Sequence, residues 1–366
     1  MNGSIDQRPD RPKQWRGRYT GPDGKQRSRS FRTKRETEGW LRDELGKLDR
    51  GTWADPAGGM GHYGDHAERW HRGLVGIRSK TKLGYESLLR CRVLPTFATY
   101  QLRRIDPASV RTWISDMDAD GLSPSRIRQA HQVLRASLDQ AVDDGLIPRN
   151  PAVGIKVPAD RTREMLFLTA EQVHELADLA GEHQPGADTL VTFLAWSGLR
   201  WSEAVALRSR SLDVLRNRVT VSEAATEVGG KLVYGPTKTH RARTIVIPRS
   251  VSNLLAVNAI PDLSGDPVFT APRGGPLRSS NFRRAVWLPS VATFTAAYPN
   301  LIGLRVHDLR HTAASLAISV GGNIKAIQRM LGHKTASITL DRYGHLYDED
   351  LIALADRMDQ RFRGAA

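Results

Sequence analysis

The segment HDLRHTAASL, residues 307–316, places two histidines four residues apart, with Asp308 after the first and Arg310 before the second. On a helix His307 and His311 would share one face, which is the spacing that zinc hydrolases use to bind their metal. However, Asp replaces the Glu of that pattern, a guanidinium opposes a divalent cation, and no acidic third ligand stands nearby. The segment therefore favours a metal-free site in which imidazole and guanidinium groups surround an anion.

Three further segments carry polar residues that break the local apolar pattern. SGLRWSE places Arg200 after the glycine that ends an apolar helix, and Glu203 follows three residues later. GPTKTHRARTI places Lys238 on an expected hairpin, in a chain with 11 lysines among its 54 basic residues. MLGHKTASITLDRYGHL places His333 after an amphipathic helix and Tyr343 ten residues further on. The alternative interpretations are that Arg200 is an exposed residue paired with Glu203 and that Lys238 only binds a polyanion.

Together these residue types suit the cleavage of a phosphodiester without a metal. A tyrosine hydroxyl can attack phosphorus while arginines offset the negative charge that builds on the equatorial oxygens. The planar fork of arginine fits two non-bridging oxygens, lysine can protonate the departing 5′ oxygen, and histidine can assist proton movement at the nucleophile. A phosphotyrosine link would store the energy of the broken bond for later rejoining. Such chemistry needs no metal and no cofactor.

The charge balance makes DNA the first candidate for that anion. In the 366 residues, 54 Lys and Arg outnumber 39 Asp and Glu, which gives a net charge of +15 and a sequence pI near 10.3. A solvated basic surface without a partner is the alternative. The single cysteine, Cys91, excludes an internal disulfide, and the sequence has neither an apolar signal core nor a window apolar enough to span a bilayer. We therefore expect a cytoplasmic protein with no membrane partner.

Two linkers, near residues 51–62 and 156–165, indicate a multidomain chain that is mainly α with small β-sheets. The expected domains are a three-stranded sheet plus one helix over residues 1–52, an all-α bundle over 62–157 and a mixed α+β domain over 166–366.

Capping signals place several helices in the second and third domains. In the second, helices should begin at Asp106-Pro107 and Ser123-Pro124. In the third, a capping box from Thr169 to Gln172 opens a helix. The segments 217–224 and 241–248 alternate like two strands that flank a Gly-rich turn.

The N-terminal block is strongly basic. Residues 11–35 hold ten Lys and Arg against one acid, Asp23, and the basic residues alternate on both sides of the turn GPDG. This spacing predicts a hairpin with one cationic face, followed by a helix that a Thr33 to Glu36 capping box opens. We interpret the cationic face as a DNA-binding surface, although a solvated edge hairpin would look similar. The residues expected to contact DNA are Arg16, Arg18, Lys25, Arg27 and Arg29.

The ordered segments SGLRWSE, TKTHRARTI, HDLRHT, LGH and LDRYGHL resemble the catalytic domain of the tyrosine recombinases, the phage integrase family, over about residues 165–350. The resemblance implies that Tyr343 is the nucleophile; Tyr347 would lie on the same helical face, and the RYGH context selects Tyr343. It also implies that Glu203 and His311 support the site. The remaining catalytic residues that it implies are Arg200, Lys238, His307, Arg310 and His333.

The resemblance further implies a site-specific recombinase that cuts and rejoins double-stranded DNA through a 3′-phosphotyrosine link. The middle domain would bind core sites and the N-terminal domain arm sites, within a homotetramer, and an excision factor and a host DNA-bending protein are candidate partners. The apolar stripe of residues 348–364 would dock on a neighbouring subunit or, alternatively, on its own domain. The rival functions are a non-catalytic DNA-binding regulator on the same fold and a type IB topoisomerase.

Overall fold

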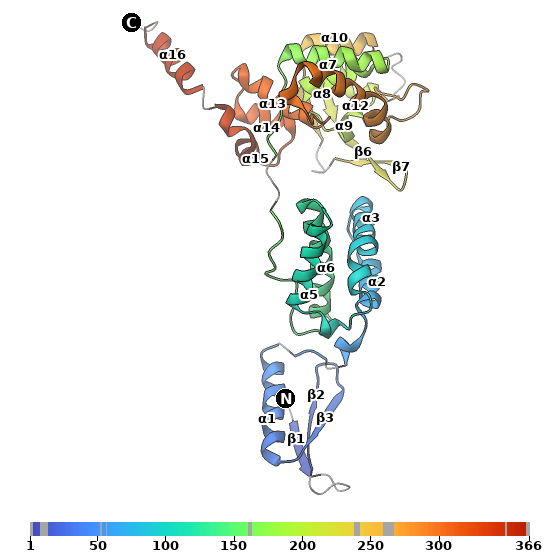
Figure 1. Ribbon diagram of the computed structural model, residues 1–366. Coiled ribbons are helices and arrows are strands. Elements are labelled where there is room, and N and C mark those ends of the chain that lie inside the picture. Colours follow the sequence, from blue (N-terminus) through green and yellow to red (C-terminus); the bar gives the residue numbers. More distant parts are fainter. Residues whose placement is uncertain are drawn as a thin grey trace. The chain divides into compact units, whose positions relative to one another are not determined.

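The computed structural model describes residues 3–7, 14–51, 53–55, 57–159, 163–237, 242–258, 267–347 and 350–363 (Figure 1). The chain divides into two compact units, Met1–Thr162 and Arg163–Ala366. Both contain mainly helices with small antiparallel sheets, which confirms the predicted fold class. The finer division into three domains stays a prediction.

The N-terminal part of the first unit is a three-stranded antiparallel sheet covered by one helix. Strands β1 (Gly3–Gln7), β2 (Trp15–Thr20) and β3 (Gln26–Phe31) lie in that order, and helix α1 (Lys34–Asp49) packs against the sheet. The predicted capping box is confirmed, because Thr33 and Glu36 exchange hydrogen bonds at the start of α1. The third strand expected in this sheet is β1, whose five residues GSIDQ pair with β2 outside the hairpin.

The prediction of one cationic face on this hairpin is wrong. Residues that pair directly across two strands point to the same face, and Arg27 pairs with Tyr19 whereas Arg29 pairs with Gly17. Both Tyr19 and Gly17 are buried on the side of α1. Arg16 pairs with Ser30 instead, and Arg18 with Ser28, so these two arginines lie on the opposite face. A period of two fixes the alternation within each strand, but the turn fixes the register between them.

Most of these arginines also have acidic partners within the protein. Both Arg16 and Arg18 form ion pairs with Asp6 of β1, at 2.9 and 3.0 Å. The Arg27 guanidinium lies over the ring of Trp53 and forms ion pairs with Asp23 and Asp55, at 2.8 Å each. Arg27 therefore ties the hairpin to the segment that follows α1. Lys25 and Arg29 are exposed, so they remain the more accessible candidates for DNA contacts.

The rest of the first unit is a helical bundle. Its helices are α2 (Tyr63–Gly73), α3 (Ser79–Leu88), α4 (Leu94–Phe97), α5 (Pro107–Ala119) and α6 (Pro124–Asp143), with a π-helical segment at Leu89–Val93 between α3 and α4 and short 3₁₀ turns at Gly58–Met60 and Leu102–Arg104. The helix starts predicted at Asp106 and Ser123 are confirmed, since both side chains accept a bond from a backbone N–H of the first turn. Apolar side chains from all these helices form one core.

The second unit contains most of the helices. These are α7 (Ala170–His183), α8 (Ala187–Ser197), α9 (Trp201–Ala204), α10 (Arg249–Asn258), α11 (Ser279–Phe282), α12 (Leu288–Ala297), α13 (Asp308–Ser319), α14 (Ile324–Leu331), α15 (Ala336–Tyr343) and α16 (Asp350–Arg363). A π-helical segment at Arg283–Trp287 joins α11 to α12, and 3₁₀ turns lie at Ser209–Ser211, Pro299–Leu301 and Gly344–Tyr347. The predicted capping box of Thr169 and Gln172 is present at the start of α7.

Two small sheets complete this unit. One has the order β4 (Leu212–Asp213), β5 (Arg218–Val221) and β8 (Arg243–Val246), which confirms the two predicted strands. The expectation that a Gly-rich turn joins them directly is wrong, because β6 (Glu223–Val228) and β7 (Lys231–Pro236) form a separate hairpin between them, around Gly229 and Gly230. Their weak apolar alternation, EAATEV and KLVYGP, hid this hairpin from sequence reasoning.

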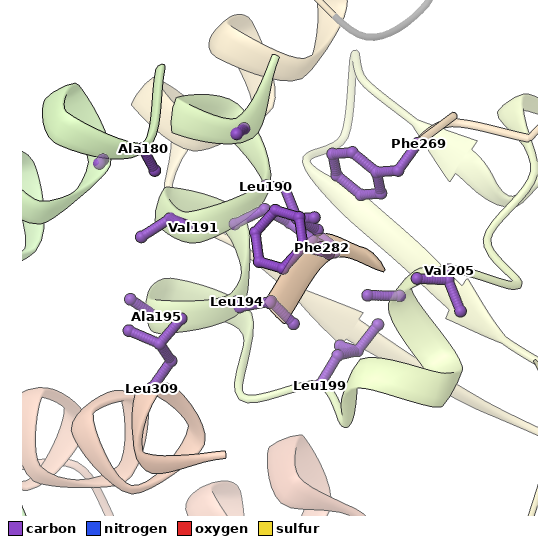
Figure 2. Close-up of a cluster of buried hydrophobic side chains, with 14 of the residues drawn as sticks. Ala180, Leu190, Val191, Leu194, Ala195, Leu199, Val205, Phe269, Phe282 and Leu309 are labelled. Atoms are coloured by element: carbon purple, nitrogen blue, oxygen red, sulfur yellow. The ribbon is translucent and has the colours of Figure 1, made fainter. Parts of the chain in front are cut away.

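The core of the second unit surrounds α8 and extends to the residues that directly precede Arg200 and Arg310. Figure 2 shows Leu199 and Leu309 in the same apolar cluster as Leu194 of α8. These two leucines are 1% and 0% exposed and directly precede Arg200 and Arg310. Because each arginine follows a fully buried anchor, its backbone position is fixed by the core.

Helix α16 confirms the helix expected near the end of the chain, and its described side chains Met358 and Phe362 are 65% and 76% exposed. Among the helices that the structure describes, we find none with the length and apolar character needed to cross a membrane.

Candidate active site

Arg200 stands where α8 turns into α9. Gly198 ends α8 with a left-handed φ of 65°, and an added Cβ would lie 2.8 Å from a methyl carbon of Leu331. Both the backbone angle and the close approach therefore require glycine in the SGLRWSE motif. The turn places Arg200 at the N-cap of α9, where its side chain is 28% exposed.

Glu203 holds this arginine from the first turn of α9. Its carboxylate accepts bonds from the backbone N–H and from Nη1 of Arg200, both at 2.9 Å. The same carboxylate accepts two bonds from Arg243 on β8, from Nη1 at 3.0 Å and from Nη2 at 2.7 Å. Glu203 is 2% exposed, yet these arginines outweigh its burial and lower the pKa of its carboxyl to about 2. It is ionised at any physiological pH.

Arg310 lies on α13 and is 3% exposed. Its Nη1 donates to the carbonyl of Gly198 at 2.5 Å, and its Nη2 donates to the carbonyl of Leu331 at 2.6 Å. These bonds join the end of α8 and the end of α14 through one guanidinium. Burial and then the charge of Arg200 lower the pKa of Arg310 to about 9. The guanidinium stays charged at neutral pH. A bound anion would offset the free-energy cost of burying that charge.

Tyr343 is the last residue of α15 and is fully buried. Its hydroxyl lies 2.8 Å from Nδ1 of His311, and the ring of His307 stands edge-on to that of His311, with centroids 5.2 Å apart. Tyr347, by contrast, donates from its hydroxyl to the carbonyl of Gly322 at 3.3 Å. Of the two hydroxyls, that of Tyr343 therefore lies against His311 of the HDLRHT helix, and that of Tyr347 lies against the carbonyl of Gly322.

His333 follows Gly332, the residue in left-handed conformation (φ 67°) that ends α14. Its Nδ1 lies 2.9 Å from the hydroxyl of Thr339, a fully buried residue of α15. This contact links His333 to the helix that carries Tyr343 and leaves the Nε2 edge of the ring for another partner.

Burial and positive charge keep the three histidines of the site neutral. Burial is the main cause that lowers the pKa of His311 and of His333, each to about 4. Burial, followed by the charge of Arg310, also lowers the pKa of His307. Burial raises the pKa of Tyr343, although the charges of Arg310 and Arg342 oppose that rise. A neutral imidazole beside a protonated phenol can accept its proton when the phenol attacks.

The structure therefore brings together most of the residues predicted for the site. The place where α8–α9, α13 and α14–α15 meet holds seven of them: Arg200, Glu203, Arg310, His307, His311, His333 and Tyr343. Lys238 lies outside the described residues. Within the part of the chain that the structure describes, no group of three or more His, Cys, Asp or Glu side chains is placed to hold a metal ion.

Sequence reasoning missed two residues of this arrangement, Arg243 and Thr339. Arg243 did carry a signal. In RARTIVIP it has the same parity as Ile245 and Ile247, which are 3% and 4% exposed, so the strand pattern places an arginine on the core-facing side. A charged side chain on that side needs polar partners, and the carboxylate of Glu203 supplies them for Arg243. Thr339 carried no such signal.

Comparisons with known proteins show which family this chain resembles. Residues 166–350 match the model described as the phage integrase family, and residues 66–117 match the phage integrase N-terminal SAM-like domain. The chain is 30% identical to a putative prophage phiRv2 integrase of Mycobacterium tuberculosis, over 94% of this chain and 92% of that protein. It is also 30% identical to the integrase of Mycobacterium phage D29, over 88% and 85% of the two chains.

Two solved structures have a similar fold. A Tn1549 transposon integrase in complex with transposon right end DNA matches with a TM-score of 0.68 at 21% identity, over 82% of this chain and 100% of that one. A lambda integrase dimer bound to a COC′ core site matches with a TM-score of 0.59 at 18% identity, over 91% and 93% of the two chains. On these matches the chain belongs to the phage integrase family, the tyrosine-type site-specific recombinases.

Proposed function

We propose that this chain cuts and rejoins DNA at specific sites through a covalent link between Tyr343 and a 3′ phosphate. The observation that carries the proposal is the position of the Tyr343 hydroxyl. It is held by His311, one residue after Arg310, and Arg310 itself bonds to the backbone on both sides of the site. A nucleophile, a proton acceptor and a charge donor thus converge from α13 and α15.

In the proposed reaction the Tyr343 oxygen forms a bond to the scissile phosphorus while the bond from phosphorus to the 5′ oxygen breaks. The tyrosine proton passes to a neutral imidazole, for which His311 is the nearest candidate. The charge that builds on the non-bridging oxygens is offset by Arg200 and Arg310. Lys238 protonates the departing 5′ oxygen, and attack by a 5′ hydroxyl of another strand reverses these steps and rejoins the DNA.

Because Tyr343 is 0% exposed, its hydroxyl must be uncovered before a phosphate can reach it. We propose that this happens when the protein assembles on duplex DNA, as four copies on two sites. A lambda integrase tetramer bound to a Holliday junction, which matches this chain with a TM-score of 0.57 at 18% identity, is consistent with such an assembly. An excision factor, a host DNA-bending protein and separate core and arm sites belong to the same proposal.

The test is a recombination reaction with the purified protein. Plasmids that carry the DNA on either side of the coding sequence are incubated with the native protein, and new junctions are sequenced. A recombinase produces junctions at one defined position, and the Tyr343→Phe variant produces none while binding the same DNA. A type IB topoisomerase would relax any supercoiled plasmid without junctions, and a non-catalytic regulator would bind without cutting. Either outcome contradicts the proposal.

A further inference from the structure

The carboxylate of Glu203 is shared unequally between two arginines. Arg243 donates to it with both Nη atoms, whereas Arg200 donates from its side chain with Nη1 alone. Among the described residues, no hydrogen bond is found for Nη2 or Nε of Arg200, and its side chain is 28% exposed. The guanidinium of Arg243 is more buried, with a side chain that is 13% exposed.

This inequality has a consequence for phosphate binding. A carboxylate and a guanidinium prefer a two-bond, fork-to-fork pair, which is also the geometry with which arginine binds two phosphate oxygens. Glu203 gives that geometry to Arg243. Arg200 consequently keeps two nitrogens that are not bonded to the carboxylate and that can face an incoming phosphate.

Arg243 is itself held in place from behind. Gly332, which directly precedes His333, lies so close that an added Cβ would come within 2.9 Å of Cζ and Nε of Arg243. The guanidinium is thus confined between the Glu203 carboxylate and the end of α14. To leave Glu203 to Arg200, the Arg243 guanidinium would have to break two hydrogen bonds and lose its packing against the end of α14.

We propose that Arg243 is a positioning residue: by occupying the two-bond edge of Glu203, it keeps the Arg200 guanidinium available for the scissile phosphate. The inference rests on the proposed function of Arg200. It requires no contact between Arg243 and DNA. Without Arg243, the Glu203 carboxylate forms two hydrogen bonds with the Arg200 guanidinium and draws that guanidinium away from the phosphate.

The test measures the rate of covalent complex formation in a single turnover, on a nicked duplex built around the mapped cleavage position, with the full chain. Arg243→Gln should slow cleavage by roughly ten- to a hundredfold, as for the loss of an oriented charge donor. Affinity for the same duplex should change by less than about threefold, because one phosphate contact among many is lost. The matched control is Arg216→Gln, on the turn between β4 and β5, where the side chain is 71% exposed and pairs with Asp213. Its rate should equal that of the native protein.

Two double variants separate positioning from other roles. In an Arg200→Ala background, Arg243→Gln should add less than about a threefold further loss, because its effect passes through Arg200. Adding Glu203→Gln to Arg243→Gln should restore part of the rate, because the competing carboxylate is gone.

A multiplicative loss in the first double variant would mean that Arg243 touches the phosphate itself, and no recovery in the second would mean that Glu203 does not compete. Either result overturns the inference. If Arg243→Gln fails to fold, as judged by circular dichroism, Arg243→Lys serves in the same two combinations. If the native protein forms no covalent complex, the proposed function fails, and the inference fails with it.

Discussion

Replacing Glu203 by glutamine should destabilise the second unit by an amount that the structure allows us to estimate. The carboxylate accepts four hydrogen bonds and is 2% exposed. Its pKa falls from the ordinary 4.5 to about 2, a difference that corresponds to about 3 kcal/mol of stabilisation at pH 7. We expect Glu203→Gln to lower the free energy of unfolding by that amount, because two partly buried guanidinium groups lose their anion.

The contribution of Glu203 also has a defined dependence on pH. A carboxyl with a lowered pKa in the folded state stabilises the protein above its unfolded pKa, and the stabilisation is lost as the pH falls through the folded pKa. The difference between native protein and variant should therefore be constant above about pH 5 and shrink to about 1 kcal/mol by pH 3. No such change is expected between pH 6 and 8.

The assay is urea unfolding of the full chain at pH 7 and pH 3, followed by tryptophan fluorescence. The control is Glu223→Gln, whose carboxylate pairs with Arg208 at 4.0 Å and is 41% exposed, and which should change stability by no more than about 0.5 kcal/mol. If Glu203→Gln unfolds within about 1 kcal/mol of the native protein at pH 7, or if the difference is as large at pH 3, the assignment of a buried, ionised carboxylate is refuted.

Three further substitutions test the backbone, the hairpin and the proposed general acid. Gly332→Ala should lower the free energy of unfolding by about 1–2 kcal/mol, because the residue has a left-handed backbone, and it should also slow cleavage. Gly274→Ala, with a φ of 76° and no neighbour within 4 Å of an added Cβ, should show only the backbone cost in thermal unfolding. Arg27→Gln should lower the melting temperature by a few degrees, because it loses Trp53 and two aspartates, whereas Arg29→Gln should not, and circular dichroism of both variants checks this. Lys238→Ala should slow cleavage of ordinary DNA but not of a 5′-bridging phosphorothiolate, whose leaving group needs no proton, and equal defects on both substrates would exclude general acid catalysis.

Local signals in the sequence sufficed wherever a single element determined the outcome. Capping residues at Thr33, Asp106, Ser123 and Thr169 marked helix starts that the structure confirms, because a cap depends only on its own first turn. The ordered motifs placed the site between residues 200 and 343, since the resemblance rests on several segments together.

What failed depended on pairing between elements. The alternating arginines of β2 and β3 were expected on one face, but cross-strand register separates Arg16 and Arg18 from Arg27 and Arg29. A period of two carries no information about register. In the same way, the partner of Arg243 is 40 residues away in the sequence, at Glu203, and only the tertiary fold brings them together.

The central claim is that Tyr343 attacks the scissile phosphate, and the most direct measurement is to identify the residue that becomes joined to DNA. The native protein is trapped on a nicked duplex and digested with protease, and the peptide that carries the nucleotide is sequenced by mass spectrometry. We predict a 3′-phosphodiester on Tyr343, a free 5′ hydroxyl on the other DNA end, and a yield that excess chelator does not change. A nucleotide on Tyr347, a 5′-phosphate link, or a reaction that stops with chelator and returns with zinc would contradict the account.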